Sequence, residues 1–91
     1  MSYRNQLQEI KPGPFKYLPL RPSTRDGISI AVLLARNKHP VFPRSWWARF
    51  AVLLEEVGEL IWAVVWERDP QRIRAEALDC IAVLVRILEG D

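Results

Sequence analysis

The fold of this chain is decided by residues 50–79, which read FAVLLEEVGELIWAVVWERDPQRIRAEALD. Up to Asp69–Pro70, apolar residues recur every three or four positions, which is the period of an amphipathic helix. Because Asp is a preferred helix N-cap and Pro suits the first helical position, this step predicts the end of one helix and the start of another. A connection this short predicts that the two helices are antiparallel neighbours.

The two predicted helices extend well beyond this stretch. The longer helix should begin at about residue 43 or 45 and end at residue 68, and the other should run from the break to about Gly90, which occupies a C-cap position. Their apolar stripes are Trp46, Phe50, Leu53, Val57, Leu60 and Val64 in the longer helix, and Ile73, Ala77, Cys80, Ile81, Leu84 and Leu88 in the other. Further apolar residues make the first stripe wider than one short partner helix can cover, so we expect a subunit interface.

The segment before these helices predicts a third, shorter helix. It should span residues 24–37, with Ser23 or Thr24 as its N-cap and Asp26 in its first turn. Residues 1–22 contain four prolines and should form an extended arm, which packs on a neighbouring subunit or reaches over a bound phosphate. We therefore predict an all-α protein in which residues 23–91 form one domain: a short N-terminal helix, then a long antiparallel helix pair, completed by oligomerisation into a four-helix-bundle-like core.

Length and composition restrict the possible functions. A chain of 91 residues that is 49% hydrophobic predicts one globular domain with a thin core, which favours assembly with copies of itself. The net charge of +2 is too small to indicate a nucleic acid polymer as partner. A single cysteine fits a reducing compartment, and we see neither a signal peptide nor an apolar run near the ~20 residues of a membrane span. We expect a cytoplasmic protein without a membrane partner.

Two pairs of acidic residues carry the candidate chemistry: Glu56 with Glu59, and Glu76 with Asp79. Within each pair, the spacing of three places both carboxylates on one face of a helix. Both pairs lie at comparable distances from the break at Asp69–Pro70, so in a helical hairpin they can face each other. Facing carboxylates repel and raise one another's pKa, a conflict that a bound divalent cation resolves. Oxygen ligands without nitrogen or sulfur favour Mg²⁺, Mn²⁺ or Ca²⁺, and Mg²⁺ typically meets its substrate through phosphates.

The same residues carry a resemblance to a known family. Glu-Glu-Val-Gly-Glu-Leu at 55–60, followed after sixteen residues from Glu59 by Glu-Ala-Leu-Asp at 76–79, resembles the E-x-x-E, E-x-x-D signature of the MazG-like superfamily of all-α nucleoside triphosphate pyrophosphohydrolases. This superfamily includes dimeric dUTPases and phosphoribosyl-ATP pyrophosphohydrolase. The resemblance covers residues 46–90. Family members often continue into a further segment that holds substrate, whereas this chain stops at Asp91, so substrate contacts are expected from its N-terminal half or from another subunit.

The resemblance implies a house-cleaning hydrolase. Its expected reaction is hydrolysis of a nucleoside triphosphate between the α and β phosphates, to give a monophosphate and pyrophosphate, in a homodimer or homotetramer. Its expected cofactor is Mg²⁺, with Mn²⁺ possible, and the matched positions make Glu56, Glu59, Glu76 and Asp79 the metal ligands. Glu55 and Glu56 are the expected catalytic residues, with Glu55 helping to position water.

Four further residues are candidates for substrate binding, each with an alternative role. Arg49 lies one heptad before Glu56 and Arg86 lies seven residues after Asp79, so each could bind a phosphate or simply neutralise the acids. Arg72 lies four residues before Glu76, where an ordinary helical ion pair could form instead. Trp46 could stack on a base or pack in the core or an interface. The alternative function is a non-catalytic helical homo-oligomeric interaction module.

Overall fold

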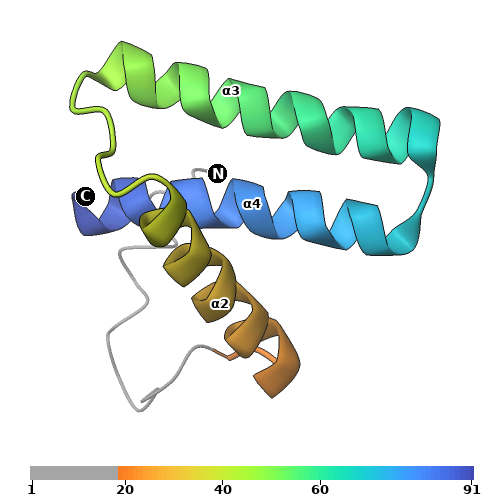
Figure 1. The fold of residues 1–91 in the computed structure, drawn as a ribbon. Helices are drawn as coiled ribbons and strands as arrows, with labels where there is room; N and C mark the ends of the chain where they lie inside the picture. The colour runs from red at the N-terminus through yellow and green to blue at the C-terminus, as the bar shows by residue number, and fades with distance from the viewer. Residues whose placement is uncertain (1–18) are drawn as a thin grey trace, which may run out of the picture.

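The computed structural model describes residues 19–91, and their regular structure is entirely helical (Figure 1). Helix α2 spans Pro22–Lys38, helix α3 spans Trp46–Trp62 and helix α4 spans Pro70–Glu89, while the π-helical turn η1 (Ala63–Glu67) continues α3. The all-α prediction is therefore confirmed for the described part of the chain. Most of the expected arm, residues 1–18, lies outside it.

Helices α3 and α4 lie side by side as an antiparallel hairpin (Figure 1). The carboxylate of Asp69 accepts a hydrogen bond from the backbone N–H of Gln71 at 3.0 Å, and Pro70 opens α4. At the other end, Gly90 has a φ of 74°, the left-handed conformation that ends many helices and that favours glycine. The predicted break, N-cap and C-cap of this helix are all confirmed.

Two other helix ends differ from the prediction. Helix α2 begins at Pro22 rather than near Thr24, because the fixed φ of proline suits the first helical position. Its N-cap residue, Arg21, makes no side-chain hydrogen bond to the helix end. The α-helical hydrogen bonding of α3 stops at Trp62 and gives way to η1. Arg68 then takes the left-handed conformation, with φ of 56°, and its N–H donates to the carbonyl of Ala63 at 2.7 Å.

Helix α2 crosses the hairpin and packs on α4 (Figure 1). A Cβ on Gly27 would lie 3.3 Å from a guanidinium nitrogen of Arg74 and 3.6 Å from both δ-methyl groups of Leu78, so glycine allows the close approach of the two helices. With α3 on one side and α2 on another, α4 has the largest set of buried residues of the three helices: Glu76, Cys80, Ala82, Val83 and Arg86.

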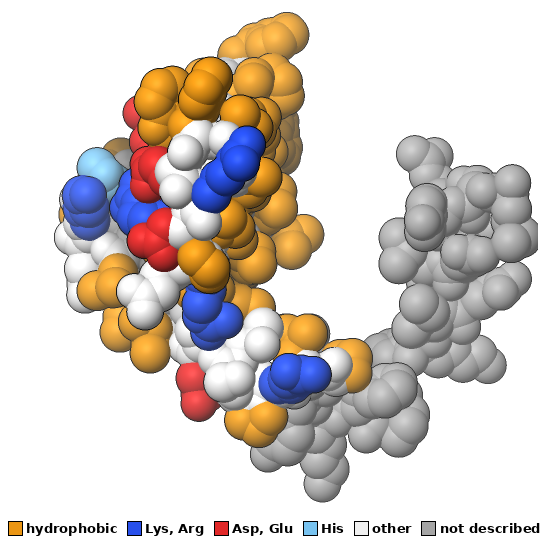
Figure 2. Space-filling view, turned by 90° about the vertical axis from the view of Figure 1, so that its right-hand side faces the viewer, with side chains coloured by type: hydrophobic (Ala, Val, Ile, Leu, Met, Phe, Trp, Pro, Cys, Tyr) orange, Lys and Arg blue, Asp and Glu red, His pale blue; other side chains and the backbone are white. Residues whose placement is uncertain are grey.

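Much of the predicted apolar stripe of α3 lies on the surface of the described chain. Trp46 is 70% exposed and Phe50 is 53% exposed, and Trp47 on the adjoining face reaches 82%. Figure 2 shows hydrophobic side chains gathered along one side of the molecule. The buried apolar core is correspondingly small, and it consists of Val32, Phe42, Ala63, Cys80, Ala82 and Val83. None of the helices within residues 19–91 combines the length and the apolar character needed to cross a bilayer.

Candidate metal centre

Three of the four predicted metal ligands meet between α3 and α4. We call Glu56, Glu76 and Asp79 the acidic cluster, because one carboxylate oxygen of each lies within 4.8 Å of the others. Glu56 projects from α3, while Glu76 and Asp79 lie one turn apart on α4. The hairpin thus brings together acids from both predicted pairs. The fourth predicted ligand, Glu59, lies outside this group of three, although its charge acts on every member of it.

The acidic cluster contains two buried oxygens that accept no hydrogen bond from the described residues. They are Oε2 of Glu56 and Oε2 of Glu76. The whole Glu76 residue is only 4% exposed, and its Oε1 is paired with the guanidinium of Arg72 at 2.8 Å. Burying a carboxylate oxygen without a partner costs free energy, so both oxygens have unused capacity to bind a cation or a donor.

The electrostatics of the cluster follow from burial and repulsion. Burial, followed by repulsion from Glu59 and Asp79, raises the pKa of Glu56 to about 7. Burial also raises the pKa of Glu76, although Arg72 opposes the shift, and burial with repulsion from Glu59 raises the pKa of Asp79. The predicted conflict among facing carboxylates is therefore present.

These groups fit a hard divalent cation. All three side chains offer carboxylate oxygens that lie close enough to share one ion, and two buried oxygens, one each of Glu56 and Glu76, have no partner among residues 19–91. Cys80 is buried beside them, and burial foremost, then the charge of Glu56, raises the pKa of its thiol. A protonated thiol is not a metal ligand, so the donor set remains one of oxygen atoms, which suits Mg²⁺ or Mn²⁺.

A cavity of about 1120 Å³ opens beside the acidic cluster, between α2, the α2–α3 loop, α3 and α4. Its acidic part is lined by Glu55, Glu56 and Asp79, and basic side chains line it at Lys38 and Arg86. Most of the remaining wall is apolar and includes Ile30, Leu34, Val41, Phe42, Val52 and Leu78. In Figure 2, acidic side chains lie near basic ones and the histidine on the side of the molecule away from the hydrophobic face. The cavity therefore combines acidic, basic and apolar surface.

Sequence reasoning did not identify Lys38 and His39 as cavity residues. Lys38 is the last residue of α2. Its positive charge lowers the pKa of Asp79 and so partly opposes the effect of burial, which means that its ammonium group acts electrostatically on the acidic cluster. His39 follows it and lines the same cavity. The sequence did offer one indication: residues 38 and 39 lie where the first helix gives way to the acidic hairpin, and the linking segment must pass one end of that hairpin.

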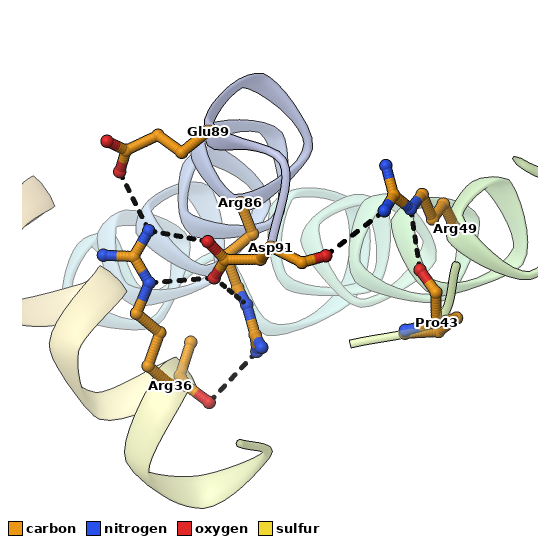
Figure 3. A network of polar contacts seen from close by, with 7 residues as sticks. Arg36, Pro43, Arg49, Arg86, Glu89 and Asp91 are labelled. Carbon is orange, nitrogen blue, oxygen red and sulfur yellow. Dashed lines mark hydrogen bonds and ion pairs between the residues drawn. The ribbon is translucent and has the colours of Figure 1, made fainter. Parts of the chain in front are cut away.

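Two of the predicted substrate residues, Arg49 and Arg86, belong to a polar network around Asp91 (Figure 3). Arg49 donates from Nε to the carbonyl of Pro43 at 2.7 Å. Arg86 donates from Nε to the Asp91 carboxylate at 3.0 Å, and it also lines the cavity beside the acidic cluster. Their guanidinium groups thus have fixed partners within the chain.

The other two substrate candidates also have local partners. Arg72 pairs with Glu67 at 3.1 Å and with Glu76 at 2.8 Å, so the helical ion pair considered as its alternative role does form. The Trp46 ring lies under the guanidinium of Arg49, 5.0 Å from its centroid, and lines a smaller pocket of about 380 Å³. Trp46 therefore belongs to a separate, apolar pocket, whose lining does not include the acidic cluster.

We compared the chain with protein-family models, with curated proteins and with solved structures, and none of the three comparisons gave a match. The resemblance to MazG-like enzymes therefore rests on the two acidic motifs of the sequence alone.

Proposed function

We propose that this protein is a Mg²⁺-dependent nucleoside triphosphate pyrophosphohydrolase, which cleaves between the α and β phosphates and releases a nucleoside monophosphate and pyrophosphate in a house-cleaning role. One observation carries the proposal: two buried, unpartnered carboxylate oxygens face a third carboxylate beside a large cavity. An all-oxygen site of this kind is typical of Mg²⁺ that acts on phosphates.

In this proposal the acidic cluster holds the cation, and Glu59 supports it as a fourth acid. The bound cation would neutralise charge on the phosphates and promote ionisation of a water molecule. Glu55 precedes Glu56 on α3 and lines the same cavity, so its carboxylate is placed to orient water or to accept a proton.

The cavity accounts for the proposed substrate class. Lys38 offers positive charge to phosphate oxygens, and the apolar wall offers a surface for a base. Arg86 adds positive charge to the wall, although Asp91 and the carbonyl of Ala35 hold its guanidinium. Arg72 is held by Glu67 and Glu76, so its contribution would come through the acidic cluster rather than through a free guanidinium.

The test is pyrophosphate release from a panel of canonical and modified nucleoside triphosphates, with Mg²⁺ or Mn²⁺ present. We expect turnover of at least one substrate and a loss of about a hundredfold or more in Glu56→Gln, since even outer changes around a metal cost 10–100-fold. Glu89→Gln is the matched control, because Glu89 is exposed and pairs with Arg36 near the surface. No turnover by the parent protein with either metal would remove the proposal.

We further propose that the exposed face of α3 joins copies of this chain into a homodimer or homotetramer. Gly58 supports this assembly, because a Cβ there would meet nothing within 4 Å and glycine in a helix interior costs about 1 kcal/mol relative to alanine. A closely packed helix of a second copy would explain a glycine at that position. Analytical ultracentrifugation should show that the parent is an oligomer. Leu54 lies one turn before Gly58 and is 50% exposed, so Leu54→Glu should convert this oligomer to a monomer. A monomeric parent would contradict the proposed assembly.

The same exposed face favours a second candidate function, a non-catalytic helical homo-oligomeric interaction module. Thermal melts separate the two candidates. A cation that binds only the folded chain adds about 2.7 kcal/mol to the free energy of unfolding at a hundredfold excess over Kd. Asp79→Asn should abolish this gain if the site is a metal centre, whereas the module predicts no gain in either protein.

A further inference from the structure

Three guanidinium groups from three helices converge on Asp91 (Figure 3). Arg36 of α2 binds both carboxylate oxygens, from Nε to Oδ2 at 2.8 Å and from Nη2 to Oδ1 at 3.0 Å. Arg86 of α4 donates from Nε to Oδ2 at 3.0 Å, and Arg49 of α3 donates from Nη2 to the main-chain oxygen at 3.2 Å. We call Arg36, Arg49 and Arg86 the arginine cluster.

The chain fixes two members of the arginine cluster independently of Asp91. Arg86 is 3% exposed, donates from Nη1 to the carbonyl of Ala35 at 3.3 Å and lies over the Phe42 ring, 4.6 Å from its centroid. Arg49 is also buried, donates to the carbonyl of Pro43 and lies 5.6 Å from the same ring. Their positions therefore do not depend on the acid that they bind.

Asp91 itself has a slighter attachment. It follows Gly90, whose left-handed conformation turns the chain back over the end of α4, and its N–H donates to the carbonyl of Arg86 at 3.0 Å. Its side chain is 19% exposed and that of Arg36 is 39% exposed, so one side of the contact faces solvent. Hydrogen bonds from Arg36, foremost, and from Arg86 hold the pKa of the Asp91 carboxyl below its usual value, as expected for a bound anion.

We propose that the arginine cluster is a binding site for a phosphate-class oxyanion, which Asp91 fills as a tethered stand-in until such an anion displaces its carboxylate. Planar guanidinium groups bind phosphate oxygens in pairs, as Arg36 here binds the two carboxylate oxygens. Arg36 and Arg86 share the single negative charge of the Asp91 side chain, so an anion with more than one charge suits this pair of guanidinium groups better than a single carboxylate.

This site is distinct from the acidic cluster although one cavity touches both. Arg86 lies seven residues after Asp79 on α4, a separation of about 10 Å along the helix axis. The anion could be free phosphate or pyrophosphate, or the polyphosphate of a nucleotide. The inference does not rest on the proposed hydrolase activity, because it requires no divalent cation.

The test is a calorimetric titration of the metal-free protein with inorganic phosphate at constant ionic strength. Asp91→Asn keeps the shape of the side chain and removes its charge, so we expect phosphate to bind about tenfold more tightly than to the parent, because the competing occupied state is lost. Glu89→Gln is the matched control, since it removes the same charge but Glu89 does not fill the cluster, and its gain in phosphate affinity should be much smaller than that of Asp91→Asn. Adding Arg36→Gln to Asp91→Asn should abolish the gain.

Equal phosphate affinity in the parent and Asp91→Asn would overturn the proposal, and so would an equal gain in Glu89→Gln, which would indicate only a change in net charge. A nucleoside triphosphate in EDTA that binds Asp91→Asn more tightly than phosphate does would identify a polyphosphate as the ligand, and equal affinity would identify free phosphate. If Asp91→Asn does not fold, the Nε–H resonances of Arg36 and Arg86 in the parent should shift saturably with phosphate and not with chloride. Repeating the titration in Glu56→Gln separates this site from the metal centre.

Discussion

The acidic cluster and the arginine cluster are both groups of like charges drawn together by the three helices, but the chain treats them differently. The arginine cluster receives a carboxylate from Asp91, and each guanidinium in it has a hydrogen-bond acceptor. Among the described residues, the acidic cluster pairs with one guanidinium, that of Arg72, and two of its buried oxygens have no hydrogen-bond partner. The arginine cluster is therefore stable without a ligand, and an outside anion must displace Asp91 from it, whereas a cation can bind the acidic cluster without displacing a partner from the two buried oxygens.

Removing a guanidinium from the neutralised cluster should give the largest change in stability. Arg86→Met keeps the buried stem but removes one donor from Asp91, which retains Arg36, and one from the carbonyl of Ala35, which retains the N–H of His39. Because a charged donor of two hydrogen bonds is lost, we expect a loss of about 2 kcal/mol in the free energy of unfolding, measured with urea. Arg44→Met on the surface is the control and should change stability by no more than about 0.5 kcal/mol. Equal effects of the two substitutions would mean that the network does not stabilise the fold.

The unneutralised cluster should instead make the metal-free protein sensitive to pH. The pKa of Glu56 in the folded state, about 7, lies above its usual value of 4.5, so the folded state binds more protons than the unfolded state between these pH values. Its contribution to stability is complete below pH 4.5 and is lost as pH rises through 7. Because the carboxyl is partly screened by solvent, we expect a loss on the order of 1–2 kcal/mol between pH 5 and 8.

Urea unfolding in EDTA at several pH values measures this loss. Glu56→Gln should flatten the curve, while Glu55→Gln on the exposed side of α3 should leave most of it. Mg²⁺ should restore stability at pH 8 in the parent. A parent protein whose stability is unchanged between pH 5 and 8 would contradict the electrostatic account of the cluster.

A smaller effect concerns Arg72, whose guanidinium pairs with Glu76 of the acidic cluster. Arg72 neutralises part of Glu76 through the 2.8 Å ion pair, so it competes with a metal for that carboxylate. Arg72→Gln should therefore tighten Mn²⁺ binding by roughly fivefold, a modest change because half of the Arg72 side chain is exposed and such pairs are weak. Calorimetry with Mn²⁺ checks it, and weaker binding would show that Arg72 supports the site.

The features that local chemistry determines could be predicted from the sequence. The Asp69–Pro70 start and the Gly90 end of α4 depend on residues whose conformations are intrinsic, and the spacing of three within each acidic pair depends only on helix geometry. The hairpin then brings three of the four acids together. These predictions needed no knowledge of how α2 would pack.

The features that depend on tertiary packing could not be predicted in this way. The exposure of Trp46 and the burial of Arg49 and Arg86 both depend on which face of each helix meets its neighbours. Arg86 pairs with Asp91, and no periodic pattern in the sequence indicates such a pair. The π-helical turn η1 was also not predicted, because its residues, Ala63–Glu67, continue the helical sequence pattern of α3 without a break.

The central claim is that the acidic cluster takes its counter-ion from outside the chain, and direct titration with Mn²⁺ tests it. We expect the folded parent to bind one ion per cluster, with Glu76→Gln and Asp79→Asn each losing most of the affinity and Glu59→Gln losing less. Parent protein that binds no Mn²⁺ at millimolar concentration, or that binds it no better than Glu76→Gln, would contradict the claim.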